Sequence, residues 1–145
     1  MGDFWHANLM VQLDEARELK HIYVLDWELT REGLTGIEVG QFAAEIYLLR
    51  RCHVEVCKDT ASLVLEHFFK EYRKAAEPDA EAARRAIVQW GTQMAILGAR
   101  VQWGDKELSR TVVLEGVRIL VDGYEGKLDK SSVVAPLLLE QKPLD

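Results

Sequence analysis

Residues 80–102, AEAARRAIVQWGTQMAILGARVQ, carry the most regular apolar pattern in this sequence. Intervals of four, three, four, three and four residues separate its apolar positions, which are Ala83, Ile87, Trp90, Met94, Leu97 and Val101. This spacing predicts a helix that packs lengthwise against another helix. Pro78 and the capping residue Asp79 set its start, so we expect a helix from Ala80 to about Gln102.

The sequence before this stretch also has helical periodicity. From Asn8 to Arg31, apolar residues recur at helical spacing and predict a first amphipathic helix. Thr35 and Glu38 have the spacing of a capping box, which predicts the start of a second helix. That helix covers residues 37–76 either without interruption or as two helices with a break at 58–60.

After residue 102, Asp105 is placed to cap a helix from Lys106 to about Tyr124. Residues 127–145 contain Pro136 and predict a short C-terminal helix or an extended arm. We found no linker and no internal repeat. The sequence therefore predicts an all-α fold, a single-domain helical bundle of about five helices over residues 1–145.

Composition excludes several classes of protein. The chain has 145 residues, a net charge of −6 and 48% hydrophobic residues, which is typical of one globular domain. The negative charge argues against nucleic-acid binding. No apolar run approaches the roughly 20 residues of a membrane span, and the N-terminus lacks signal-peptide features. We therefore expect a cytoplasmic protein with Cys52 and Cys57 as free thiols.

His53 and Cys57 are the candidate metal ligands. Residues four apart on a helix project from the same face and can bind one ion. A complete site needs further ligands, and no second closely spaced pair supplies them. Glu18-x-x-His21 is likewise only half of a di-iron motif. We therefore expect no cofactor, with a metal ion near His53 and Cys57 as the alternative.

Motifs for catalysis are not found. The sequence has no Gly-x-Ser-x-Gly and no phosphate-binding glycine loop. Asp26, Glu28 and Glu45 are possible acid-base groups, but carboxylates are too common on helices to assign them a role. These observations favour a protein without enzymatic activity. Basic residues that could form local anion sites are Arg50, Arg51, Arg84, Arg85, Arg100 and Arg110.

Aromatic and long apolar side chains suggest an interface. Phe68 and Phe69 are adjacent on a helix and cannot both face one core, so one of them is expected to meet a second surface. The candidate interface residues are Trp5, Phe68, Phe69, Trp90, Met94 and Leu97. The sequence thus favours a small acidic interaction module, a regulator, adaptor or inhibitor that binds another protein and forms a homodimer.

The alternative hypothesis is a helical bundle that binds a small apolar ligand or a metal. Its pocket would be lined by Phe42, Ile46, Trp90 and Met94, with His53 and Cys57 nearby.

Overall fold

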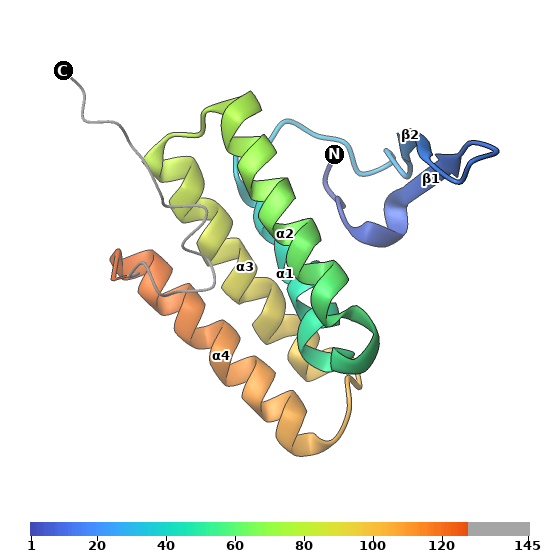
Figure 1. The fold of residues 1–145 in the computed structure, drawn as a ribbon. Helices are drawn as coiled ribbons and strands as arrows, with labels where there is room; N and C mark the ends of the chain where they lie inside the picture. Colours follow the sequence, from blue (N-terminus) through green and yellow to red (C-terminus); the bar gives the residue numbers. More distant parts are fainter. Residues whose placement is uncertain (128–145) are drawn as a thin grey trace.

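The structure is a computed structural model that describes residues 1–127. Its elements in chain order are η1 (His6–Asn8), β1 (Leu9–Leu13), β2 (Leu19–Val24), α1 (Ile37–Cys52), α2 (Val54–Ala76), α3 (Ala80–Arg100) and α4 (Lys106–Glu125). The helices pack together, and the β1–β2 hairpin extends beside them near the N-terminus (Figure 1). The mainly helical character is as predicted. The expected C-terminal arm or helix falls largely in 128–145, outside the described residues.

The helix predicted over residues 8–31 is wrong, because this stretch forms the hairpin. β1 and β2 pair antiparallel, with Leu9 opposite Val24 and Met10 opposite Tyr23. At the turn, Asp14 Oδ1 accepts a hydrogen bond from the Glu18 N–H at 2.9 Å, and Arg17 has a φ of 65°. Leu19–Val24 is rich in the apolar, aromatic and β-branched residues that favour strands.

The start and the length of α1 also differ from the prediction. The N-cap of α1 is Gly36, with a φ of 102° and no side-chain capping bond. Glu38 does not form the predicted capping box, because its carboxylate accepts hydrogen bonds from residues near the N-terminus. His53 separates α1 from α2, so residues 37–76 form two helices whose boundary precedes the predicted break at 58–60.

The predictions for α3 and α4 are confirmed. Asp79 accepts a hydrogen bond from the Ala82 N–H at 2.6 Å, and Asp105 accepts one from the Leu108 N–H at 2.8 Å. Each aspartate thus satisfies one of the free N–H groups at a helix start. Gly126, with a φ of 69°, ends α4.

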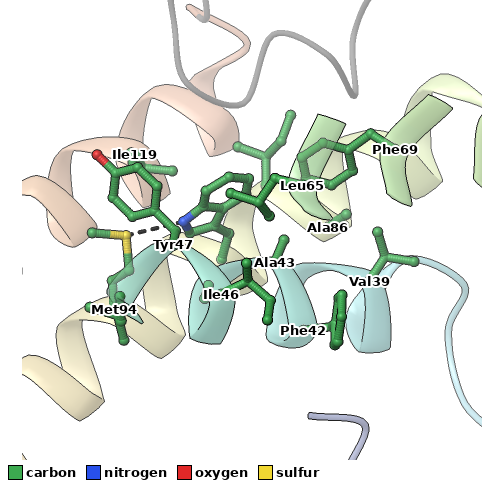
Figure 2. Packing of buried hydrophobic residues seen from close by; sticks show 14 of the residues in the cluster. Val39, Phe42, Ala43, Ile46, Tyr47, Leu65, Phe69, Ala86, Met94 and Ile119 are labelled. Carbon is green, nitrogen blue, oxygen red and sulfur yellow. Dashed lines mark hydrogen bonds between the residues drawn. The ribbon is translucent and has the colours of Figure 1, made fainter. Parts of the chain in front are cut away.

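The core lies where α1 packs against α2 and α3, and α3 packs against α4 (Figure 2). α1 and α3 run parallel, because Gly36 faces Ala82 and Glu45, further along α1, bonds to Gln93. The predicted pocket is wrong, since Phe42, Ile46, Trp90 and Met94 fill this core with exposures of 6% or less.

None of the described helices has both the length and the apolar character of a membrane span.

Candidate functional site

Residues 2–8, which we call the Asp3 segment, are held by the first half of α1. Glu38 Oε1 accepts a hydrogen bond from the Gly2 N–H at 2.6 Å, and Oε2 accepts one from the Phe4 N–H at 3.0 Å. The Phe4 ring stacks on Phe42 with centroids 4.9 Å apart. One carboxylate and one ring contact therefore fix the backbone on both sides of Asp3.

The Asp3 side chain is oriented by two amide groups. Gln41 Nε2 donates to Asp3 Oδ1 at 3.0 Å. Asn8 Nδ2 donates to the Asp3 backbone oxygen at 2.9 Å and lies 3.3 Å from Asp3 Oδ2. The Asp3 side chain is half-buried, whereas Asn8 is only 8% exposed. Both carboxylate oxygens thus have a fixed neighbour, and the group keeps access to solvent.

The hairpin returns the chain to this segment. The Leu25 N–H donates to the Asn8 carbonyl oxygen at 2.8 Å. The next residue, Asp26, is exposed and has a φ of 62°, a left-handed conformation that aspartate tolerates better than most residues. Trp27 Nε1 donates a hydrogen bond to the Val24 carbonyl oxygen at 2.8 Å, and this bond spans the two residues between them, Leu25 and Asp26. The residue just before Asp26 is therefore held against the backbone of Asn8.

A buried carboxylate, that of Glu45, lies close to the Asp3 segment. Glu45 is 6% exposed, and its Oε1 accepts a hydrogen bond from Gln93 Nε2 at 3.0 Å. Burial raises the pKa of Glu45 and the charge of Asp3 adds to that rise, while the Gln93 bond and His6 oppose it. The predicted acid-base candidate Glu45 is thus a buried neighbour of the segment, whereas Asp26 and Glu28 are exposed.

The spacing Asp3-x-x-x-x-Asn8 equals that of the kinase catalytic loop, H-R-D-x-x-x-x-N. Asp26-Trp27-Glu28 follows the hairpin as the D-F-G triplet follows this loop in kinases, with the aspartate and an aromatic residue kept. Met1-Gly2 replaces His-Arg, and Glu28 replaces the glycine of the triplet. The chain therefore has the first aspartate, the asparagine and the second aspartate of that pattern.

Sequence analysis missed Asp3 and Asn8 and considered Asp26 only as one acid among several. The available signal was the Asp-x-x-x-x-Asn spacing followed by a second aspartate before an aromatic residue. The predicted helix over 8–31 hid this signal. A continuous helix would have held Asn8 and Asp26 about 27 Å apart.

The predicted metal pair lies elsewhere. His53 is exposed between α1 and α2, and Cys57 is half-buried one turn into α2. Within residues 1–127, no group of three or more His, Cys, Asp or Glu side chains is arranged to hold a metal ion. The structure thus adds no third ligand of these types to this pair, and a metal at His53 and Cys57 stays a prediction.

The predicted interface residues have contacts inside the chain. Phe69 is buried and stacks on Trp90 with centroids 5.8 Å apart. The ring centroids of Phe68 and Phe42 are 4.6 Å apart. Phe68 therefore packs on α1, whereas Phe69 packs on α3 of the same chain. Met94 is also buried, while Trp5 and Leu97 are half-buried. An interface role for these six residues stays a prediction.

Comparison with known proteins points to an enzyme. No family model matches the chain. It is 28% identical over 148 residues to 4-hydroxytryptamine kinase of Psilocybe cubensis, a match that covers 97% of this chain and 38% of that protein. The protein of the same name from Psilocybe cyanescens is 27% identical over 127 residues, covering 86% of this chain and 34% of that protein. The chain thus spans about a third of the length of these relatives.

These similarities overturn the functional prediction from sequence. Both relatives are named as kinases, so the expected interaction module without enzymatic activity is wrong. The alternative of a pocket for an apolar ligand or metal near His53 and Cys57 has no support either. The two relatives are kinases by name, and Asp3, Asn8 and Asp26 match residue types of the kinase pattern.

Proposed function

We propose that this chain forms the catalytic part of a magnesium-dependent kinase that phosphorylates a small hydroxyl compound. The observation that carries the proposal is the hydrogen bond between the Leu25 N–H and the Asn8 carbonyl, at 2.8 Å. This bond holds the residue before Asp26 against the Asp3-x-x-x-x-Asn8 segment, and it supports a reaction centre built from the residue types that kinases use. The names of the two relatives support the same class of reaction.

In this proposal Asp3 is the base for the acceptor hydroxyl. The acceptor oxygen forms a bond to the γ-phosphorus of a nucleoside triphosphate, and its proton passes to the Asp3 carboxylate. The bond between the γ-phosphorus and the bridging oxygen breaks, which releases the nucleoside diphosphate. Gln41 and Asn8 keep the carboxylate in one orientation, so little reorganisation is needed before proton transfer.

Asn8 and Asp26 are the residues that would hold magnesium. Because Asn8 Nδ2 donates to Asp3, its Oδ1 atom is directed elsewhere, and no hydrogen bond to Oδ1 is found among the described residues. Amide and carboxylate oxygens are suitable ligands for Mg²⁺, which typically takes one or two protein carboxylates and completes its shell with phosphates and water. A bound magnesium ion would neutralise charge on the transferred phosphate group.

The acceptor class follows from the relatives and from the surroundings of Asp3. The relatives are named for 4-hydroxytryptamine, which supports a hydroxyl-bearing aromatic amine as the acceptor. Two buried nitrogen atoms near Asp3, Trp5 Nε1 and His6 Nδ1, lack a hydrogen-bond partner among the described residues. Unpaired buried polar atoms are costly, so they support a polar ligand beside Asp3.

A phosphoryl-transfer assay tests this function. The chain is incubated with MgATP and 4-hydroxytryptamine, and the phosphate ester is detected by mass spectrometry. We expect Mg²⁺-dependent ester formation that Asp3→Asn reduces by at least about 100-fold, because the variant lacks the base. Asp14→Asn, a matched change in the hairpin turn, should keep the activity. Absence of Mg²⁺-dependent transfer, or equal rates in both variants, would contradict the proposal.

A further inference from the structure

Four of the six arginines that the sequence analysis singled out have partners in the fold, including Arg50, whose guanidinium lies 5.9 Å from the centre of the Tyr47 ring. Arg84 and Arg85 pair with Glu81 at 2.7 and 3.3 Å, and Arg51 pairs with Glu115 at 3.5 Å. These pairs stabilise helix surfaces and leave those side chains less free to bind an anion. Basic residues without such pairs are therefore better placed to bind an anion.

Three basic side chains gather where α3 meets α4. Arg100 ends α3, Lys106 begins α4, and Arg110 follows one turn later. Among the described residues, no carboxylate forms an ion pair with any of the three. All three line one groove of about 670 Å³. The fold thus brings together cations that are separated in the sequence.

The groove also holds hydrogen-bond donors and an apolar wall. Ser109 contributes a hydroxyl, and Val101 and Val113 contribute apolar surface. Among the described residues of the lining, the one carboxylate belongs to Asp105, whose Oδ1 already accepts a hydrogen bond from the Leu108 N–H at 2.8 Å. The described lining thus holds three basic residues and one acidic residue, and the N-terminal end of the α4 dipole adds to the positive potential.

We propose that this groove binds a phosphate monoester. A dianionic phosphate group would lie among the three basic side chains, because charge-assisted hydrogen bonds to arginine suit its oxygens. The organic group of the ester would contact Val101 and Val113. The groove is at the C-terminal end of α3, whereas the Asp3 segment contacts the first half of α1, which runs parallel to α3. It is therefore a second site, separate from the proposed reaction centre.

Calorimetric titration with phenyl phosphate tests this site. The double variant Arg100→Gln/Arg110→Gln removes two cations, and Arg118→Gln is the matched control, since Arg118 is exposed on α4 and does not line the groove. We expect saturable 1:1 binding to the wild-type chain and to the control, and affinity weakened at least about tenfold in the double variant. Inorganic phosphate should bind more weakly, because it lacks the apolar group.

Two conditions separate this site from the kinase site. Titrations are made in EDTA and repeated with Asp26→Asn, and the amide shifts of Val101 and Ser109 are followed by NMR. Binding in the groove should survive both conditions and move these two resonances. No saturable binding, equal affinity in the double variant and control, or loss of binding in Asp26→Asn would each overturn the proposal. A failed phosphoryl-transfer assay would leave the groove result unchanged.

Discussion

Gln41 and Asp3 are 38 positions apart in the sequence, yet the Gln41 amide donates to Asp3 Oδ1 at 3.0 Å. Gln41 lies on the same face of α1 as Glu38, which binds the Gly2 and Phe4 N–H groups. One helix face thus sets both the path of the Asp3 segment and the direction of its carboxylate. α1 is itself fixed by the core, so the core determines where the proposed base points.

Gln41→Leu should lower kcat of the proposed transfer by roughly tenfold and leave KM for MgATP unchanged. The variant removes one hydrogen bond that orients the base, worth about 1–2 kcal/mol, and does not touch the proposed metal ligands. Steady-state kinetics separates the two constants. Gln102→Leu, at an exposed position after α3, is the matched control. An effect on KM alone would mean that Gln41 acts in binding.

Glu38→Ala should loosen the Asp3 segment without unfolding the helices. The Gly2 and Phe4 N–H groups lose their acceptor, and each unpaired group costs about 1–3 kcal/mol where it is buried. Hydrogen exchange of the Phe4 amide should therefore become at least about tenfold faster. Glu32→Ala, at an exposed position before α1, provides the comparison. Equal exchange in the two variants would show that Glu38 does not hold the segment.

Glu45→Gln should change how stability depends on pH. Burial raises the pKa of Glu45 in the folded chain, so the folded state binds more protons than the unfolded state just above the ordinary pKa. The Glu45 contribution to stability then falls as pH rises above the ordinary carboxyl pKa of about 4 and through the raised pKa of the folded state. The glutamine introduced at position 45 does not titrate, and its amide oxygen can still accept the hydrogen bond from Gln93 Nε2. The melting temperature of the variant, relative to wild type, should rise over this interval; a constant difference would refute the shift.

Gly91→Ala should destabilise the contact between α3 and α4. A Cβ at Gly91 would collide with backbone atoms of Gly116 and Leu120 on α4. Alanine favours an isolated helix by about 1 kcal/mol, but the collision forces the helices apart, and we expect a net loss of about 1–3 kcal/mol. Urea denaturation measures it. Gly33→Ala, where no atom lies within 4 Å of the added Cβ, should be near neutral.

The sequence predicted α3 and α4 well because their signals are local. Asp79 and Asp105 cap the helices they precede, and the stripe through Trp90 and Met94 is buried as a helix requires. The break at His53 was missed because no proline or glycine marks it. The hairpin was missed because its turn places Arg17, a residue without turn preference, at a φ of 65°.

The candidate site was less predictable than the helices. Asp26 could be singled out, but its partner Asn8 comes within reach only through the β1–β2 pairing. Glu38 was assigned to a capping box and Gln41 was not singled out, since nothing local indicates which segment they bind. Sequence periodicity reports which face is apolar, whereas this site depends on contacts between distant segments.

We propose above that Asn8 and Asp26 hold a magnesium ion beside Asp3. Titrating Mn²⁺, which substitutes for Mg²⁺ and is paramagnetic, into the ¹⁵N-labelled chain tests it most directly. Amide signals of Asn8, Leu25 and Asp26 should broaden first, and Asp26→Asn should abolish this broadening while Asp14→Asn keeps it. Broadening centred on another part of the chain, such as His53 and Cys57, or unchanged broadening in Asp26→Asn, would contradict the account.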